Sequence, residues 1–257
     1  MEIDRDHGVR LCRFANLSGF DRLSHGITTR LGGCSAPPFD SLNLGQHVGD
    51  ADDRVSANRR RVWRRFTAAK PVFLQQVHGN AVHVIDGQGN PLNAASAGAA
   101  DAVVTDQPFH LLTILVADCQ PVMLFDPVRC VIANIHSGWR GSVINIIGRT
   151  VAVMQKRFGC LPADIRAGIG PSLGPCCAEF VNYREEIPEA LWSYHVANHH
   201  FDFWAMSRDQ LLQAGLLPGR IEIGGLCTRC RHDLFFSYRA ARRTGRMAAI
   251  IGMMPLD

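Results

Sequence analysis

The stretch LLTILVADCQPVMLFDPVRCVIANIH, from Leu111 to His136, decides the fold class of this 257-residue chain. It contains three apolar runs, Leu111–Ala117, Val122–Phe125 and Val131–Ile135, and each run is bounded by Gly, Pro, Asp or Asn nearby. Short apolar runs between such turn residues are typical of buried strands. Three more runs of this kind precede the stretch, and we expect them to be strands too: Val72–Leu74, Val82–Ile85 and Ala102–Thr105.

Helical patterns are fewer than strand patterns. We expect one helix over about Asp53–Phe66, with acids at its start and arginines at its end, the charge order that the helix dipole favours. A second is expected over about Ser142–Phe158, which carries apolar residues at helical spacing, and a third, weaker one over about Ser207–Ala214. Strands in runs with few helices between them predict mixed α/β (α+β) layers. The stretch Gly87–Ala100 is interpreted as a surface loop within a single domain over residues 1–257.

The composition excludes several classes of protein. Hydrophobic residues make up 47% and charged residues 19%, which is not the composition of a disordered chain. The net charge is only +4 and the longest basic run is Arg59-Arg60-Arg61, so no nucleic-acid partner is expected. The start of the chain is charged, and the longest apolar stretch, Met247–Leu256, is about half a membrane span. We therefore expect a cytoplasmic chain with reduced thiols and no membrane partner.

Three metal-ligating side chains stand at the ends of predicted strands. His78 follows the run that begins at Val72, Cys119 follows the run from Leu111, and His136 follows Ile135. Strand ends deliver side chains into a common crevice, so these three residues could converge. Two imidazoles and one thiolate would fill three positions of a tetrahedral zinc and leave the fourth open. Their separations along the chain carry no metal signature of their own, and burial for the cysteine and turn roles for the histidines are the more common interpretation of such positions.

Other candidate sites carry weaker signals. The pair Cys227-Thr228-Arg229-Cys230, with His232 nearby, could begin a zinc site, but no second pair follows it at the usual distance. Cys176-Cys177 lies in a turn-rich loop, for which we favour a packing role. The glycine-containing segments Thr29–Gly33 and Ser41–Gly45 could hold an anion or could simply be turns.

Taken together, these segments resemble the laccase-domain family, which is also called YfiH-like or polyphenol-oxidase-like. The resemblance runs from about Ser24 to the end of the chain and rests on long polar blocks. In chain order the blocks are Thr29–Gly33, Ser41–Gly45, His47–Asp50, Asn58-Arg59, Gln75–Gly79, Asp101–Thr105, Ala117–Pro121, His136–Gly141, Gly168–Cys177, Cys227-Thr228, Phe235–Arg239 and Thr244–Arg246.

The resemblance implies a fold, a cofactor and an activity. It implies mixed β-sheets sandwiched between helices, and a catalytic zinc held by His78, Cys119 and His136. It further implies phosphorolysis of purine nucleosides (adenosine, inosine, guanosine and methylthioadenosine) together with adenosine deamination. The implied partners are therefore small-molecule purine nucleosides and phosphate. The preferred nucleoside and the oligomeric state stay open.

Phosphorolysis requires a phosphate held against the ribose, and the resembling motifs contain residues of the right chemistry. An arginine fork binds phosphate through two hydrogen bonds. The candidate phosphate- or substrate-binding residues are Arg30, Asn43, Arg59, Arg140 and Arg239. Asp118 adjoins the proposed ligand Cys119, but strand alternation would turn it to the opposite face, so we assign no general acid or base.

Three alternative functions remain at this level. The first is a copper-dependent polyphenol oxidase, although the chain has no His-X-His pair of the kind that multicopper oxidases use. The second is a metal-free amide hydrolase of cell-wall precursors, with Cys119 as nucleophile and His78 or His136 as base. The third is a binding module with a structural zinc, which three ligands and one open position argue against.

Overall fold

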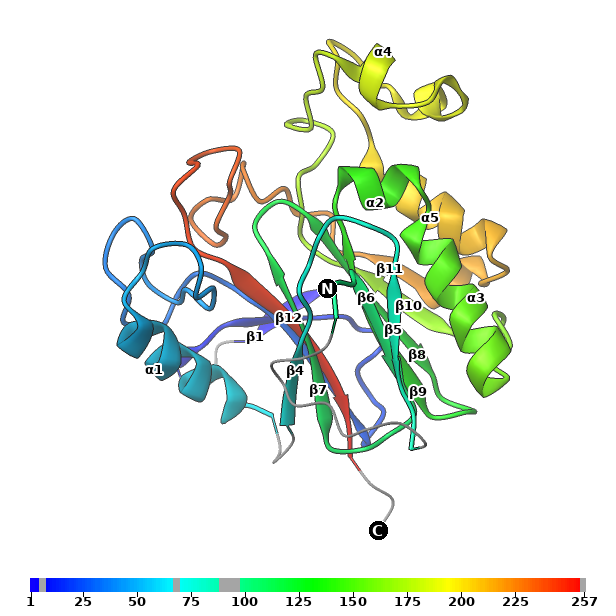
Figure 1. Cartoon of the computed structure of the whole chain (residues 1–257), viewed down its shortest axis with the longest axis horizontal. Helices are drawn as coiled ribbons and strands as arrows, with labels where there is room; N and C mark the ends of the chain where they lie inside the picture. The colour runs from blue at the N-terminus through cyan, green and yellow to red at the C-terminus, as the bar shows by residue number, and fades with distance from the viewer. Residues whose placement is uncertain (5–7, 67–69, 88–97, 255–257) are drawn as a thin grey trace.

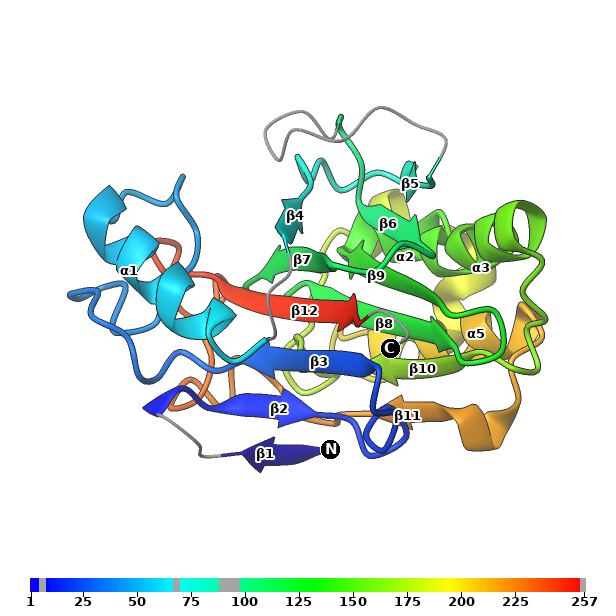
Figure 2. The same cartoon turned by 90° about the horizontal axis from the view of Figure 1, so that it is seen from below.

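Two six-stranded β-sheets form the centre of the computed structural model, which describes residues 1–4, 8–66, 70–87 and 98–254 (Figures 1 and 2). The first sheet has the order β1 (Glu2–Asp4), β2 (Leu11–Arg13), β3 (Leu23–Thr28), β12 (Met247–Met253), β7 (His110–Val116) and β4 (Lys70–Phe73). The second has the order β11 (Ile221–Ile223), β10 (Arg166–Ile169), β8 (Gln120–Asp126), β9 (Val131–Ser137), β6 (Ala102–Thr105) and β5 (Val82–Ile85). Both sheets mix parallel and antiparallel pairs.

Helices cover the outer faces of the two sheets. Helix α1 (Asp52–Trp63) packs Val62 against the first sheet, in an apolar cluster with Leu111 and Ile250. Helices α3 (Ile146–Phe158) and α5 (Phe203–Gln213) pack against the second sheet (Figure 1). The expected mixed α/β fold, with sheets sandwiched between helices, is therefore confirmed.

Strand alternation distributes the side chains of the second sheet between two cores. Val103 and Met123 face the first sheet, whereas Val104 and Leu124 face α3 and α5. On β9 the buried amide of Asn134 donates from Nδ2 to carbonyl oxygens of both strands β7 and β12, at 2.8 Å each. His136 lies two residues further along β9, so it faces the same side at the end of the strand.

The observed elements correct the expected ones in several places. Strands β5 and β6 have the expected bounds, and β4, β7, β8 and β9 are shifted or extended by one or two residues. The helix expected over Ser142–Phe158 is wrong at its start: a short helix α2 (Trp139–Val143) precedes α3, because Asn145 adopts a left-handed φ of 53° and caps α3 by accepting from the Gly148 N–H. Of the predicted loop Gly87–Ala100, residues 88–97 lie outside the described residues.

The segment between β10 and α5 projects from one end of the molecule, beyond α2 (Figure 1). It carries α4 (Tyr183–Glu186) and the 3-10 helix η2 (Glu189–Tyr194), and a second 3-10 helix, η3 (Pro218–Arg220), follows α5. An aromatic cluster that includes Phe180, Phe201 and Phe203 holds this segment against Trp139 of α2. None of the helices in the described part of the chain is long and apolar enough to cross a membrane.

Candidate metal centre and its pocket

His78, Cys119 and His136 meet at one edge of the inter-sheet core. Cys119 directly precedes β8 and His136 lies near the end of β9, as expected, but β4 ends at Phe73, so exposed His78 lies in a turn and not at a strand end. Their ligand atoms all lie within 4.8 Å of one another. The Sγ of Cys119 is 3.7 Å from Nε2 of His78, and the rings of the two histidines are 4.8 Å apart at their centroids. Zinc ligands at usual bond lengths are separated by about 3.4–3.8 Å, so this set fits one ion with small adjustments.

The buried carboxylate of Asp101 organises these residues. It is fully buried, and it accepts hydrogen bonds from the backbone N–H groups of Val77, His78 and Gly79 at 3.2, 2.9 and 2.7 Å. These bonds fix a turn in which His78 adopts a left-handed φ of 60°. Burial raises the pKa of Asp101, but hydrogen bonds from His136, Gly79 and His78 outweigh burial and hold the pKa below its usual value. The residue is therefore an ionised anchor for the site.

The same carboxylate determines which nitrogen of His136 can bind a metal. Oδ1 of Asp101 lies 2.8 Å from Nδ1 of His136. Because an ionised carboxylate only accepts, Nδ1 carries a proton and Nε2 is left to face Cys119. Carboxylate–histidine pairs of this kind commonly orient the histidine ligands of metals.

Electrostatics prepare Cys119 as a thiolate. Burial raises the pKa of its thiol, but the charge of His136 and hydrogen bonds from His136 and His78 outweigh burial and lower the pKa to about 6. Burial lowers the pKa of His136, whereas Cys119 and Asp101 raise it to about 9. A thiolate beside an imidazolium is ready to exchange the imidazolium proton for a metal ion, and it is also the pair that a metal-free cysteine nucleophile would use.

The absence of a side chain at Gly138 leaves the space that the ligands occupy. A Cβ there would lie 2.8 Å from Cδ2 of His78 and 3.4 Å from Sγ of Cys119. The backbone conformation of Gly138 is ordinary, with φ of −71°, so the requirement for glycine is one of space. The donor set, its ionisation and the space between the ligands therefore all suit a metal ion.

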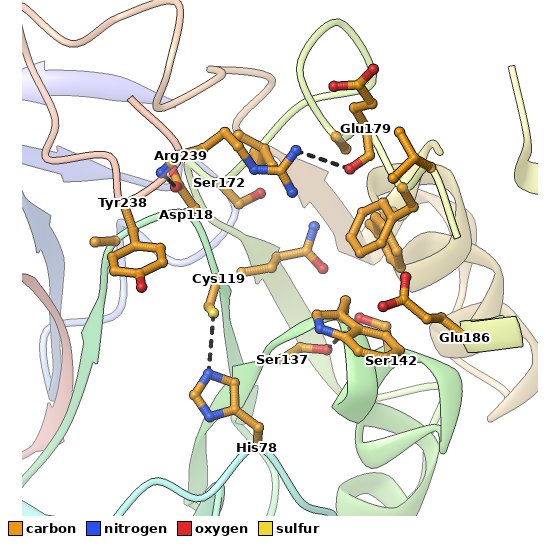
Figure 3. A pocket seen from close by; sticks show the side chains of 18 of the residues that line it. His78, Asp118, Cys119, Ser137, Ser142, Ser172, Glu179, Glu186, Tyr238 and Arg239 are labelled. Carbon is orange, nitrogen blue, oxygen red and sulfur yellow. Dashed lines mark hydrogen bonds between the residues drawn. The ribbon is translucent and has the colours of Figure 1, made fainter. Parts of the chain in front are cut away.

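His78 and Cys119 open onto a pocket of about 540 Å³, a volume suited to a small organic ligand (Figure 3). Arg239 lies across the pocket from His78, and the aromatic side chains come mainly from α2 and the projecting segment. The aromatic and charged residues that line it are His78, Asp118, Trp139, Glu179, Phe180, Glu186, Phe203, Tyr238, Arg239 and Arg242.

Comparison with known proteins identifies the relatives of this chain. Residues 24–254 match the family described as "Multi-copper polyphenol oxidoreductase laccase". The chain belongs to this family. It is 36% identical over 244 residues to "Purine nucleoside phosphorylase YlmD" of Geobacillus stearothermophilus, covering 88% of this chain and 89% of that protein. It is 34% identical over 235 residues to "Purine nucleoside phosphorylase YfiH" of Escherichia coli, covering 88% and 92%.

Solved structures of the family share the fold. The structure described as Bacillus licheniformis hypothetical protein YfiH matches with a TM-score of 0.86 at 32% identity, covering 98% of both chains. YlmD from Geobacillus stearothermophilus matches with a TM-score of 0.85 at 33% identity, again over 98% of both chains. The resemblance expected from the sequence blocks is confirmed by these matches.

Of the anion-binding candidates suggested by the laccase-family blocks, Arg239 lines the pocket. Its Nη1 donates to the carbonyl oxygen of Glu179 at 2.9 Å, and its guanidinium lies 5.7 Å from the centroid of the Phe180 ring. Arg140 is exposed on α2, 5.2 Å from the centroid of the Trp139 ring, and is not among the described residues that line the pocket. Arg239 is therefore the candidate that shares a cavity with the histidine–cysteine site.

The other three candidates hold loops together outside the pocket lining. Arg30 pairs with Asp40 at 3.2 Å, and the side chain of buried Asn43 bonds within its own loop. Arg59 donates to a backbone carbonyl and lies 4.4 Å from the centroid of the Phe73 ring. A phosphate-binding role for these three residues stays a prediction, and their observed contacts are those of structural residues.

Some residues of the site have roles that depend on tertiary contacts and are not visible in the sequence. Asp101 lies in a family block without an assigned role, and the only local signal is an acid directly before an apolar run. Asp118 lines the pocket, which corrects the expectation that strand alternation turns it to the opposite face, because it lies between β7 and β8 with a φ of 85°. Its oxygens accept from Thr228 Oγ1 and the Arg239 N–H, at 2.6 Å each. Glu186 points its carboxylate into the pocket, whereas the carboxylate of Glu179 points away (Figure 3).

Proposed function

We propose that this chain is a zinc-dependent purine nucleoside phosphorylase that also deaminates adenosine. The observation that carries the proposal is the set His78, Cys119 and His136, which opens onto an aromatic pocket with an arginine on the opposite side. The names of the relatives support the phosphorylase activity, because several are called purine nucleoside phosphorylases. Bound zinc would supply Lewis-acid chemistry and activation of water near neutral pH.

The ligands depend on neighbours that hold them in a binding geometry. Asp101 retains the proton on Nδ1 of His136 and so presents Nε2 of that residue. It also fixes the turn that carries His78 through three backbone hydrogen bonds. Gly138 leaves room between His78 and Cys119. These residues act on the metal ligands and need not touch the substrate.

The remaining pocket residues suit a purine nucleoside and phosphate. Trp139, Phe180 and Tyr238 offer ring faces and edges to a purine base. Arg239 and Arg242 offer positive charge and forked donors to phosphate. In phosphorolysis a phosphate oxygen bonds to C1′ as the bond from C1′ to N9 breaks, and the purine leaves with the electron pair and takes up a proton. In deamination water adds at C6, a proton moves to the amino group and ammonia leaves.

We assign the proton transfers to Glu186. The support is the direction of its carboxylate, which points into the pocket, while the carboxylate of Asp118 is occupied by Thr228 and Arg239. A carboxylate that points into the pocket can accept a proton from water and, once protonated, can donate it to the departing group.

The test is incubation of the zinc-loaded protein with adenosine, with and without phosphate, followed by separation of the products. Adenine and ribose 1-phosphate are expected only with phosphate, and inosine and ammonia in both conditions. The Cys119→Ala variant is expected to lose both activities, whereas Cys34→Ala, which changes an exposed thiol outside the pocket lining, is expected to retain them. If no adenine, inosine or hypoxanthine appears above the Cys119→Ala background, the proposal is wrong.

Removal and replacement of the metal separate this proposal from its two enzymatic alternatives, and any turnover argues against the third, a binding module. Loss of phenol oxidation after copper removal, with nucleoside turnover retained by zinc alone, supports the phosphorylase and limits copper to a side reaction. A metal-free protein that cleaves amide bonds in cell-wall precursors through Cys119 would instead support the cysteine hydrolase. Full phenol oxidation by copper-loaded protein without nucleoside turnover would support the polyphenol oxidase.

A further inference from the structure

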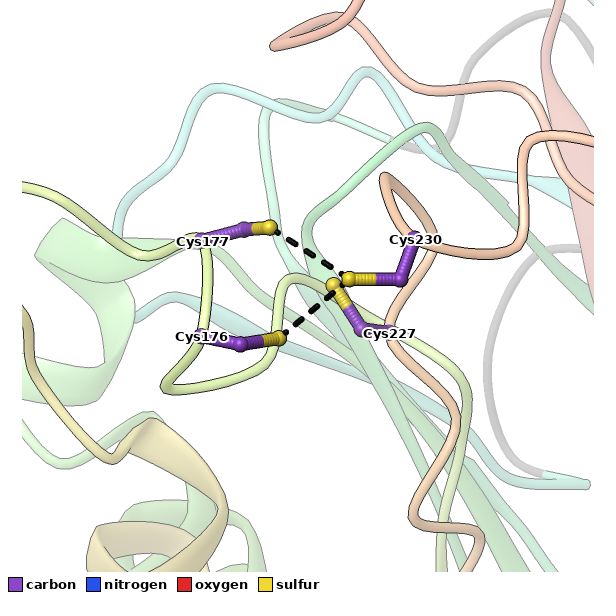
Figure 4. A group of neighbouring side chains, drawn as sticks. All are labelled: Cys176, Cys177, Cys227 and Cys230. Atoms are coloured by element: carbon purple, nitrogen blue, oxygen red, sulfur yellow. Dashed lines mark hydrogen bonds between the residues drawn. The ribbon is translucent and has the colours of Figure 1, made fainter.

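Four cysteines form a second cluster of sulfur atoms outside the histidine–cysteine site (Figure 4). Cys176, Cys177, Cys227 and Cys230 have all their Sγ atoms within 4.8 Å of one another. The Sγ of Cys230 lies 3.5 Å from that of Cys176 and 3.6 Å from that of Cys177. Cys177 and Cys227 are buried, and the other two are exposed. We call these four residues the thiol cluster.

The sheet brings the two halves of the thiol cluster together. Strands β10 and β11 are parallel neighbours, so the loops that follow them leave from the same edge of the sheet. Pairing continues into the loops, because the Thr228 N–H donates to the Ser172 carbonyl at 3.0 Å. Cys176 and Cys177 follow Ser172 in one loop, and Cys227 precedes Thr228 in the other. The second pair that a zinc site at Cys227 and Cys230 requires is thus Cys176 and Cys177, which precede them in the chain, and not a pair that follows them.

Close backbone packing keeps the two loops in contact. A Cβ at Gly174 would lie 2.7 Å from the Trp204 ring and 3.1 Å from Cβ of Cys227. The N–H groups of Cys177 and Ala178 both donate to the Gly174 carbonyl at 2.9 Å, and the Arg231 N–H donates to the Cys227 carbonyl at 2.9 Å, so backbone hydrogen bonds shape each loop around its cysteines.

The sulfur separations fit a metal ion and not a disulfide. A disulfide has a sulfur–sulfur distance of about 2.05 Å, far below the separations in the thiol cluster. Tetrahedral zinc with bonds of about 2.3 Å to four sulfurs separates those sulfurs by about 3.8 Å. The observed 3.5 and 3.6 Å, with every pair inside 4.8 Å, lie close to that value.

We propose that the thiol cluster binds a second zinc ion as a closed, four-thiolate structural site. Four protein ligands leave no position for water, which is the arrangement of structural zinc sites. Binding would release the thiol protons and cross-link the two loops through their side chains. The ion acts on structure and takes no part in the reaction. The proposal does not depend on the function proposed for His78, Cys119 and His136.

The position of the thiol cluster shows what the ion would hold. Ala178 and Glu179 follow Cys177 directly and line the pocket. Thr228 follows Cys227 and donates to Asp118, the residue next to Cys119, at 2.6 Å. A metal ion in the thiol cluster therefore fixes one wall of the pocket relative to the histidine–cysteine site. Its loss is expected to lower the unfolding temperature and to loosen substrate binding.

Metal analysis of purified, reduced protein tests the proposal with variants that empty one site at a time. Wild type is expected to contain about two zinc ions per chain, and both Cys119→Ala and the double variant Cys176→Ser/Cys230→Ser about one. Cys34→Ser, which removes a different exposed thiol, is expected to keep the wild-type content. Because Cys119→Ala leaves the thiol cluster intact, it answers the question even if the double variant does not fold.

Cobalt and thiol counting give two readouts that are independent of activity. Co²⁺ added to apo Cys119→Ala protein is expected to give intense sulfur-to-cobalt charge-transfer and visible absorption bands, which four-thiolate sites produce. Denatured Cys119→Ala protein, alkylated without reduction, is expected to show every remaining cysteine alkylated. A Cys119→Ala protein without zinc and without the cobalt bands would overturn the proposal. Two cysteines protected from alkylation as a disulfide would overturn it as well.

Discussion

The two groups of side chains with the chemistry of metal ligands, His78/Cys119/His136 and the thiol cluster, are built in different ways. His136 lies on the buried strand β9, Cys119 precedes β8 and exposed His78 lies in a turn after β4, and a fully buried carboxylate, Asp101, holds the two histidines. The thiol cluster comes from two loops at a sheet edge, held by backbone hydrogen bonds and close packing at Gly174. The first group has three side chains and faces a pocket, whereas the second has four, whose sulfur atoms face one another.

The difference separates the requirements of chemistry from those of structure. We call the site of His78, Cys119 and His136 the open site, because three protein side chains leave one position of a metal free. Its side chains are held without a fourth protein ligand, so a rigid neighbouring group has to anchor them. A closed site can be assembled from loops, because the metal itself provides the cross-link. Substitution of Asp101, which anchors the open site, is therefore expected to lower turnover. Substitutions in the thiol cluster are expected to lower stability first.

The largest effect is expected from Asp101→Asn. The amide would put a donor against backbone N–H groups that now donate to the carboxylate, and Nδ1 of His136 would lose a charged acceptor. We expect kcat/KM for adenosine phosphorolysis to fall by about 10²–10³-fold, with loss of zinc from the open site only. Steady-state kinetics and zinc content measure both results.

Asp126→Asn is the matched control for that variant. Asp126 is also fully buried, and its carboxylate accepts from the backbone N–H groups of Val128 and Arg129 in a turn at the far end of β8. This variant is expected to lose stability while retaining zinc in both sites. If it loses zinc as Asp101→Asn does, general destabilisation explains the effect and the role assigned to Asp101 is wrong.

The contrast also shows which parts of the fold the sequence could predict. The strands β5 and β6 were predicted within their observed bounds, because each is a short run rich in β-branched residues. β3 (LSHGIT) and β10 (RAGI) were not predicted, because they are short or contain polar residues and glycine, and neighbouring strands stabilise them. The break between α2 and α3 was missed because it depends on the left-handed conformation of Asn145.

The candidate sites also combine features that local sequence predicts with features that depend on tertiary contacts. Strand ends indicated that His78, Cys119 and His136 could converge, and the family resemblance selected them as a ligand set. The role of Asp101 depends on the β6–β9 register, in which Ala102 pairs with Ile135 and so places Asp101 opposite His136. The thiol cluster likewise depends on the parallel pairing of β10 and β11. Pairing between distant strands is not visible in local sequence patterns.

Glu186→Gln tests whether Glu186 transfers protons or only helps to form the wall of the pocket on the side of the thiol cluster. The change keeps the size of the side chain but removes its titratable proton, so we expect kcat to fall by about 10²-fold with little change in zinc content or unfolding temperature. Glu185→Gln is the control, because Glu185 is an exposed neighbour in α4 outside the described pocket lining. Equal activity in the two variants would assign Glu186 to shape alone.

Gly138→Ala tests the spacing of the open site without changing a ligand. The added Cβ would lie 2.8 Å from Cδ2 of His78, so we expect that ring to move and the affinity for zinc to fall by roughly tenfold. At Gly79 a Cβ would meet its nearest neighbour, Asp101, at an ordinary 3.6 Å, so Gly79→Ala is expected to bind zinc normally. Competition with a chromophoric chelator measures both affinities. Equal zinc affinities in the two variants would show that the site does not require glycine at position 138.

The smallest effect is expected from Arg239→Lys, which changes the residue that contacts both regions. Its backbone N–H donates to Asp118 beside the open site, and its Nη1 donates to the Glu179 carbonyl beside the thiol cluster. Lysine keeps the charge but loses the planar fork, so we expect the KM for phosphate to rise by less than about tenfold. Deamination without phosphate should be unchanged.

Comparison of phosphorolysis with deamination distinguishes phosphate binding by Arg239 from a purely structural role of that residue in the pocket wall. If Arg239 binds phosphate, the variant affects phosphorolysis alone, and Arg243→Lys, an exposed arginine outside the described pocket lining, leaves both reactions unchanged. If Arg239 mainly joins the wall to the open site, deamination falls with phosphorolysis, because both reactions use the same pocket. A parallel fall in the two rates would therefore remove Arg239 from the phosphate site and assign it to the structural link between the two regions.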